Sequence, residues 1–145
     1  MKCIVDTNVL FTFFWKSSAF SILSQRDDLQ LFSPAYALEE IEKYESEIIQ
    51  KAKLTKEKFQ RLKEDLALTI HFMYEDEYAS SFKNAAALAK ELPEENREEF
   101  LEDIDFIALS LKMDCPLWTH DKLLRKQSRV HVLGTKEIIT LLSIT

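Results

Sequence analysis

The feature that most constrains this fold is the alternation of short, β-prone apolar runs with longer helical segments. Such alternation is typical of a parallel sheet with helices on both faces, so the sequence predicts the α/β class. The predicted strands are residues 2–5, 29–32, 69–73, 116–119 and 130–133. The predicted helices are residues 9–15, 18–24, 34–50, 55–68, 75–92, 98–113, 122–127 and 134–144.

The length and composition of the chain favour a single domain over residues 1–145. Apolar residues make up 46% of the 145 residues, which is enough for a sizeable core. The sequence has no internal repeat and no linker-like segment that would divide it. Ser33 and Pro34 are predicted to be the N-cap and the first residue of the helix 34–50, the positions that each residue type favours.

Composition also excludes several classes of protein. A single glycine, Gly134, rules out glycine-rich phosphate or dinucleotide loops. Cys3 and Cys115 cannot form a disulfide framework and indicate a reducing compartment. We find neither an apolar run long enough to cross a membrane nor an N-terminal export signal, so a cytoplasmic protein is expected. The net charge of −6 argues against general nucleic-acid affinity unless some of the acids bind metal.

Four acidic residues lie where an open α/β sheet places its functional groups. Asp6 directly follows the first predicted strand, and Asp121 follows the strand 116–119. Glu40 and Asp103 lie on predicted helices that can face the same crevice. Converging carboxylates repel one another and are costly to desolvate. A divalent cation removes both costs, and oxygen ligands favour Mg²⁺ or Mn²⁺.

Each acid also has a purely structural interpretation. Asp6 and Asp121 can cap the helices that follow them, and Asp103 can be a first-turn acid favoured by the helix dipole. Glu40 can be one more acid of a Glu-rich helix, and periodicity alone does not separate it from Glu42 or Glu45. The joint placement of the four acids carries the metal hypothesis.

Four segments of the sequence resemble the motifs of the PIN domain family, in the order in which that family has them. They are Val5-Asp6-Thr7-Asn8, the segment 33–41, the segment 103–110 and the segment 116–124. The second motif has its acid directly before an aliphatic residue, which places the role on Glu40 rather than on Glu39. The third has its acid five residues before Ala108, which is Asp103.

The resemblance implies a three-layer α/β/α fold around a five-stranded, mostly parallel sheet, and metal-dependent hydrolysis of RNA. Asp6, Glu40 and Asp103 would hold the principal Mg²⁺ or Mn²⁺, and Asp121 would complete the site or hold a second ion. Asp105 is a candidate secondary ligand. Asn8 and Thr119 would orient waters or a carboxylate, although a helix cap and a strand end are equally good interpretations of these two residues.

Two further patterns bear on partners. Lys122, Arg125 and Lys126 form a basic run beside Asp121 that could follow a phosphate backbone. The basic residues between 51 and 63 are better explained as a solvated helix face. Four bulky aromatic residues between Phe11 and Trp15 exceed what one buried face usually holds, and they suggest a homodimer interface.

Three biological roles remain open at this point. A short chain of this kind resembles the toxin of a toxin–antitoxin pair, which would bind an antitoxin protein. A housekeeping RNA-processing nuclease is the second role. A PIN fold that binds nucleic acid or assembles with partners without cleaving is the third, and only an activity measurement separates it from the other two.

Overall fold

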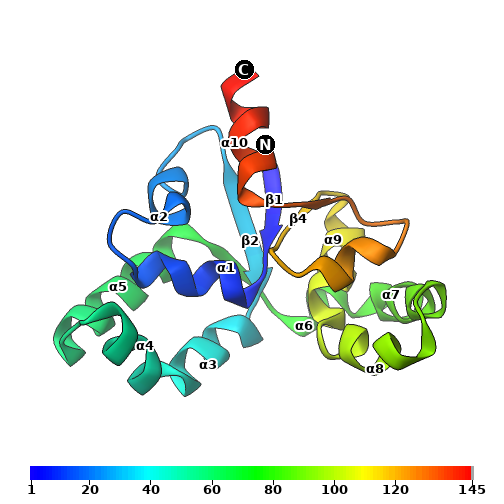
Figure 1. Cartoon of the computed structure of the whole chain (residues 1–145), viewed down its shortest axis with the longest axis horizontal. Coiled ribbons are helices and arrows are strands. Elements are labelled where there is room, and N and C mark those ends of the chain that lie inside the picture. The colour runs from blue at the N-terminus through cyan, green and yellow to red at the C-terminus, as the bar shows by residue number, and fades with distance from the viewer. Residues whose placement is uncertain (145) are drawn as a thin grey trace.

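A five-stranded, all-parallel sheet forms the centre of the protein in the computed structural model, which describes residues 1–144 (Figure 1). The strand order is β3-β2-β1-β4-β5, with β1 in the middle. The strands are β1 (Lys2–Val5), β2 (Gln30–Pro34), β3 (His71–Met73), β4 (Leu117–Trp118) and β5 (Val132–Leu133). The predicted α/β class and the parallel sheet are therefore confirmed.

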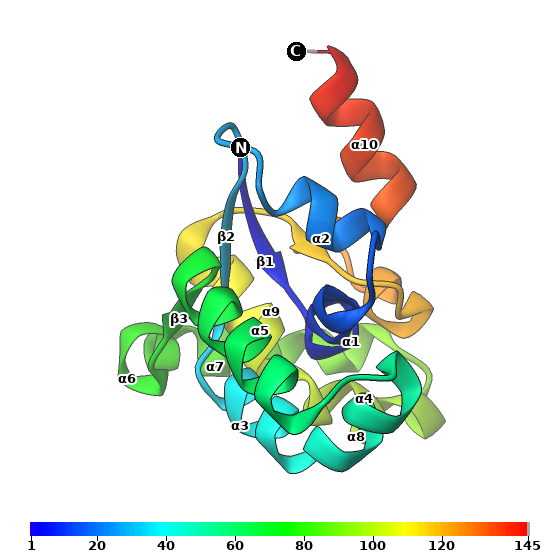
Figure 2. The same ribbon diagram turned by 90° about the vertical axis from the view of Figure 1, so that its left-hand side faces the viewer.

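Helices pack on both faces of this sheet (Figures 1 and 2). The α-helices are α1 (Thr7–Phe11), α2 (Ala19–Leu23), α3 (Tyr36–Lys43), α4 (Glu45–Ala52), α5 (Lys56–Thr69), α6 (Glu75–Tyr78), α7 (Phe82–Ala87), α8 (Glu94–Glu102), α9 (Ile104–Met113) and α10 (Thr135–Ile144). Short 3-10 turns are η1 (Thr12–Phe14), η2 (Ala79–Ser81), η3 (Leu88–Glu91) and η4 (Lys122–Lys126).

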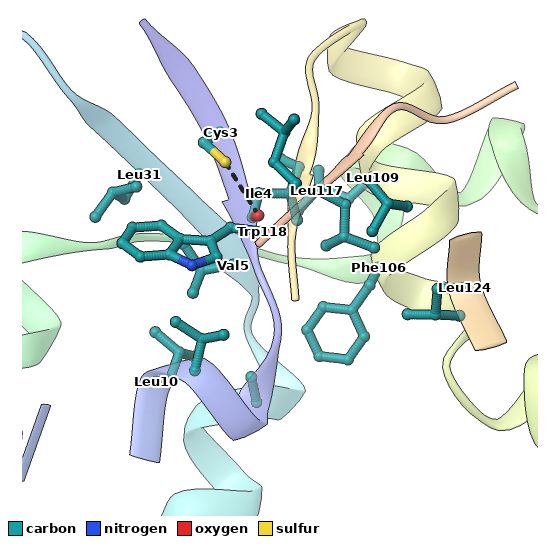
Figure 3. Packing of buried hydrophobic residues seen from close by; sticks show 14 of the residues in the cluster. Cys3, Ile4, Val5, Leu10, Leu31, Phe106, Leu109, Leu117, Trp118 and Leu124 are labelled. Atoms are coloured by element: carbon teal, nitrogen blue, oxygen red, sulfur yellow. Dashed lines mark hydrogen bonds between the residues drawn. The ribbon is translucent and has the colours of Figure 1, made fainter. Parts of the chain in front are cut away.

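The core has one layer on each side of the central strand β1. Phe106 and Leu109 of α9 pack against one face, while Trp118 and Leu10 lie on the other (Figure 3). Trp118 is fully buried and meets Phe20 of α2 edge to face, with ring centroids 5.2 Å apart. Because parallel strands are covered on both faces, they are apolar at nearly every position, which explains the short apolar runs of the sequence.

The aromatic stretch after β1 is largely absorbed by this core. Phe13 and Phe14 are buried, and Phe14 stacks on Phe59 of α5 with ring centroids 5.0 Å apart. Phe11 and Trp15 are half-buried. Packing within a single chain thus covers most of the surface of these rings. The homodimer suggested by their number stays a prediction.

The prediction for Ser33 and Pro34 was wrong. Both residues belong to β2, and α3 begins at Tyr36 after Ala35, which makes no side-chain cap. The Ser33 hydroxyl donates instead to the Val5 carbonyl oxygen, 2.8 Å away on the neighbouring strand. Proline at the end of a strand costs no ladder hydrogen bond, so local preference alone does not distinguish these two positions.

Three of the longer predicted helices are divided in the structure. The segment 34–50 breaks at Tyr44 (φ −98°, ψ 18°), and the segment 98–113 begins earlier, at Glu94, and breaks at Asp103 (φ −103°, ψ 19°). The segment 75–92 consists of α6, η2, α7 and η3. Apolar periodicity continues across such breaks, because the successive short helices cover the same sheet, and so it does not reveal them.

The last helix, α10, projects toward the end of the molecule at which the chain begins (Figures 1 and 2). Its buried residue Ile138 faces the core, and Thr135 accepts a hydrogen bond from the indole nitrogen of Trp118 at 3.1 Å. Within residues 1–144, none of the helices combines the length and the hydropathy that a bilayer crossing requires.

Candidate metal centre

A cavity of about 220 Å³ contains all four predicted acids in its lining: Asp6, Glu40, Asp103 and Asp121. They come from four separate parts of the chain. Asp6 follows β1, Glu40 lies on α3 after β2, Asp103 joins α8 to α9, and Asp121 follows β4. The carboxyl ends of parallel strands share one edge of a sheet, and it is this edge that brings the segments together.

Asp6 is the most deeply buried of the four, with 6% of its surface exposed. One carboxylate oxygen accepts the backbone N–H of Val9 at 3.0 Å, and the other accepts the Thr119 hydroxyl. Burial raises the pKa of Asp6 above its usual value, while these two hydrogen bonds act in the opposite direction. The N-cap interpretation of Asp6 is therefore correct, and the same carboxylate also reaches the cavity.

Glu40 is held from the neighbouring helix α1. The buried Thr7 hydroxyl donates to the Oε1 atom of Glu40 at 3.0 Å. Its other carboxylate oxygen makes no further hydrogen bond in the part of the chain that the structure describes. One oxygen is thus oriented by the protein and the other is free to meet a ligand.

Of the four acids, Asp103 has the fewest hydrogen bonds to its side chain and the largest shift in pKa. Among residues 1–144, none donates a hydrogen bond to its side chain, which is half-buried at the α8–α9 break. Burial, followed by repulsion from Asp121, Asp6 and Glu40, raises the pKa of Asp103 to about 7. The three other acids of the cavity are therefore close enough to act on it.

Asp121 is tied to the same network through Thr119. One carboxylate oxygen accepts the Leu123 N–H at 2.9 Å, so Asp121 caps η4, as its structural interpretation had it. The Asp121 backbone N–H donates to the Thr119 hydroxyl oxygen at 3.0 Å. Because that hydroxyl donates in turn to Asp6, Thr119 links the two acids that follow β1 and β4.

The charged groups that line the cavity offer oxygen ligands, which a hard divalent cation prefers. All four charged groups are carboxylates, and one of them, Asp103, accepts no hydrogen bond from another residue among those described. Within residues 1–144, however, no three His, Cys, Asp or Glu side chains are placed so that they could hold an ion together. Like charges without a counter-ion repel, so the carboxylates must draw together for an ion to bind.

The structure separates the remaining predicted residues into two groups. Asn8 lines the cavity, and Thr119 is buried directly beside it. Asp105 does not line the cavity, and its carboxylate accepts the Tyr78 hydroxyl at 2.7 Å. None of the three predicted basic residues belongs to the lining: Arg125 is paired with Glu137, Lys126 reaches Asn96 at 3.3 Å, and Lys122 is exposed.

Sequence reasoning missed the neutral part of the lining, which is Thr7, Phe11, Tyr44 and Phe106. Thr7 belongs to the Asp-Thr-Asn motif, but a threonine at a helix start is common and by itself indicates no site. Tyr44 lies four residues after Glu40, so helical spacing places it on the same face, and this signal was available in the sequence. Phe11 gave no signal that separates it from the aromatic core residues around it.

Comparison with known proteins decides the family. The family model described as PIN domain matches residues 4–141. This chain belongs to the PIN domain family. PIN domains are in general nucleases, and they generally use divalent metal ions. The match spans all four acids and runs from the last two residues of β1 into α10, so it covers nearly the whole arrangement described above.

A solved structure shares this fold. This chain is similar to a chain in the crystal structure of VapBC2 from Rickettsia felis bound to a DNA fragment from their promoter. The two chains share 12% sequence identity at a TM-score of 0.62, over 92% of this chain and 98% of the other. Identity at that level shows the shared PIN fold alone. No curated protein matches the sequence.

Proposed function

We propose that this PIN domain is a ribonuclease that depends on Mg²⁺ or Mn²⁺ and hydrolyses RNA phosphodiester bonds. The observation that carries the proposal is the meeting of Asp6, Glu40, Asp103 and Asp121 in one cavity at the carboxyl edge of the sheet. Four acids from four segments are costly to place together, and a bound cation offsets that cost. When bound, the cation would activate water and stabilise the charge that develops on the phosphate.

The side chains of the cavity would hold the cation in different ways. Asp6 is held by hydrogen bonds from Val9 and Thr119, so it would offer the cation a carboxylate in a fixed position. Glu40 is oriented by Thr7 and offers its second oxygen. Asp103 has a pKa of about 7, so its carboxyl is partly protonated near neutral pH. It would release that proton when a cation binds. Asp121 would complete the set, and Asn8 would orient water at the rim.

We further propose that the nuclease is the toxin of a toxin–antitoxin pair, with a small antitoxin protein as its partner. The support is the likeness to a VapBC complex, together with the coverage of nearly the whole of both chains. Co-purification of this chain with the product of an adjacent small gene, and loss of cleavage in that complex, would support the toxin role. A housekeeping nuclease would cleave without any such inhibitor.

Cleavage of mixed RNA substrates by the purified protein tests the enzyme proposal. The reactions contain Mn²⁺, Mg²⁺ or EDTA, and the same panel is run with single-stranded and duplex DNA. We expect cutting of RNA that depends on the metal and that falls at least 100-fold in the Asp103→Asn variant. Asp103→Asn suits this purpose because its side chain makes no hydrogen bond that the substitution would break within the described residues.

Asp105→Asn is the matched control, because Asp105 lies on α9 two residues after Asp103 and outside the cavity. It is expected to cleave at nearly the wild-type rate. Equal cutting by wild type and Asp103→Asn would assign the activity to a contaminant. Absence of cutting with every metal and substrate would favour the alternative of a PIN fold that binds nucleic acid or partners without cleaving.

A further inference from the structure

A second cavity, of about 530 Å³, lies among η1, the start of α2 and the turn that joins α4 to α5. It shares no lining residue with the cavity of the four acids. Its volume is within the range of about 300–1,000 Å³ that is usual for small-molecule sites. Three lysines line it, and no aspartate or glutamate among the described residues does. They are Lys16, Lys53 and Lys58, and we call this space the lysine cavity.

The three lysines of this cavity have no acidic partner within residues 1–144. Two lysines of the same helices that lie outside the lining are paired, in contrast. Lys51 contacts Glu47 at 2.7 Å, and Lys63 contacts Glu42 at 3.2 Å. A chain with a net charge of −6 thus gathers three unpaired cations at one place. Like charges repel one another, and an anion bound among them removes that repulsion.

The apolar part of the lysine cavity is aromatic. Phe13 and Phe14 line it from the core and are buried, while Trp15 is half-buried. Within residues 1–144, Trp15 stacks on no other ring and its indole N–H donates no hydrogen bond. The other tryptophan, Trp118, is fully buried and donates to Thr135 at 3.1 Å. A partly open indole with an unused donor offers a planar ligand both a stacking surface and a polar contact.

Two left-handed residues, Ser17 (φ 62°) and Lys53 (φ 56°), also line the lysine cavity. Lys53 ends α4 as its C-cap, with a ψ of 50°. Glycine is the usual residue for this conformation, because a Cβ atom makes it unfavourable. Strained residues of this kind gather at binding sites, where the side chain has a use that the favoured residue could not serve. Here that use is a cation at the cavity.

We propose that the lysine cavity binds a nucleoside diphosphate, with the base against Trp15 and the diphosphate among the three lysines. Lysine ammonium groups bind phosphate as point charges, and the indole supplies the largest flat apolar surface of any side chain. A carboxylate in the lining would repel such a ligand, and the described lining has none. The site goes beyond the proposed nuclease function and does not depend on it, since the two cavities have no residue in common.

Isothermal titration calorimetry of the wild type in EDTA tests this site, with ADP, adenosine and inorganic pyrophosphate as separate probes. EDTA removes divalent cations, so the four acids of the other cavity repel a diphosphate instead of holding one through a metal. We expect saturable binding of ADP, and binding weaker by about tenfold for adenosine and for pyrophosphate, because each retains one half of the contacts. Trp15 emission should change with the same Kd, since Trp118 is fully buried.

Two variants test the cation and the ring separately. Lys53→Gly removes the cation but suits the left-handed backbone, so it should weaken ADP binding about tenfold while the Tm is kept or raised. Trp15→Leu should weaken ADP binding about tenfold through the loss of stacking. Lys51→Gln is the matched control, because it makes the same change in net charge on α4 outside the lining. It should bind ADP within about twofold of the wild type.

Three results would overturn the inference. The first is that ADP does not bind in EDTA, or binds Lys53→Gly as tightly as Lys51→Gln. The second is that pyrophosphate or a single-stranded RNA binds as tightly as ADP with the same sensitivity to the variants, which would make the cavity a general anion or nucleic-acid surface. The third is a dimer, seen by sedimentation, in which Trp15 is shielded from acrylamide quenching, because a second copy then covers the cavity. None of these results bears on the proposed nuclease.

Discussion

The Thr119 hydroxyl donates a hydrogen bond to the carboxylate of Asp6, although the two residues are 113 positions apart in the sequence. The Asp6 backbone N–H also donates to the Trp118 carbonyl oxygen, at 3.2 Å, so the residue after β1 is fastened to β4 by both its backbone and its side chain. Asp6 is thus attached to the sheet itself and is placed by two neighbouring strands rather than by a mobile loop.

Replacing Thr119 with valine should destabilise the protein by about 1–3 kcal/mol, because a buried carboxylate oxygen loses its donor. That bond lowers the pKa of Asp6, so its loss disfavours the ionised form, and the destabilisation should be larger at pH 8 than at pH 5. Urea unfolding at the two pH values measures this difference. Thr119→Ser, which keeps the hydroxyl, is the control. A loss that is the same at both pH values would show that packing, not the hydrogen bond, is responsible.

Ionisation of Asp103 should make the metal-free protein less stable as the pH rises. Its folded pKa of about 7 lies above the ordinary aspartate value of 3.8. Well below pH 3.8 the carboxyl is protonated in both states and costs nothing. Between pH 3.8 and 7 the unfolded state loses its proton first, and the penalty grows to its full size above pH 7. Asp103→Asn should therefore be more stable than wild type at pH 8 in EDTA, by about 1–2 kcal/mol, since partial exposure screens the repulsion.

The same variant should match wild type at about pH 3, where the Asp103 carboxyl is protonated in both the folded and the unfolded state. Chemical unfolding in EDTA across this range measures the difference. A variant that is less stable than wild type at pH 8 would mean that the Asp103 carboxylate makes a favourable contact that outweighs its crowding.

Divalent cations should stabilise the folded protein through these acids. A ligand that binds only the native state adds about 2.7 kcal/mol at a concentration 100 times its Kd. We expect Mn²⁺ and Mg²⁺ to raise the Tm of wild type at pH 8, EDTA to reverse the shift, and Asp103→Asn to abolish most of it. Asp105→Asn should keep the shift. A full loss in Asp105→Asn as well would make Asp105 a ligand, in addition to its bond with Tyr78.

The two adjacent acids of α3 should behave differently in the cleavage assay. Glu40 lines the cavity, whereas Glu39 is exposed and does not. Glu40→Gln should lower kcat/KM at least 100-fold, because the carboxylate that Thr7 orients loses its charge. Glu39→Gln, with the same change in net charge, should stay within twofold. Equal losses in the two variants would indicate a general effect of helix charge.

Of the three predicted phosphate contacts, Lys122 should matter most. Arg125 is already paired with Glu137, whereas Lys122 is exposed next to Asp121. Lys122→Gln should weaken RNA binding at low salt and reduce the slope of log Kd against log salt by about one, and Arg125→Gln should change the slope less. Binding titrations at several salt concentrations test this. A larger effect of Arg125→Gln would mean that RNA displaces Glu137.

The parts of the fold that follow from local patterns could be predicted. The runs 2–5 and 116–119 lie over β1 and β4, and the helix predicted to begin near residue 55 is α5, with Thr55 as its N-cap. The breaks at Tyr44 and Asp103 could not be predicted, since neither is a glycine or a proline and apolar spacing continues through both. Packing across the sheet selects such a break. Each is important here, because it sets the position of a residue that lines the cavity.

The sequence by itself determined the α/β class and the parallel sheet, because strand and helix periodicity are local properties, and the resemblance to the family's motifs named the four acids that line the cavity. Only the tertiary structure decided which neighbours each acid has: Thr7 for Glu40, Thr119 for Asp6, and no hydrogen-bond donor for Asp103 within residues 1–144. It also decided that Phe11 and Tyr44 meet beside the acids while Phe14 is in the core. Contacts of this kind depend on how distant segments pack, and their energies come from burial and charge at positions that no local pattern specifies.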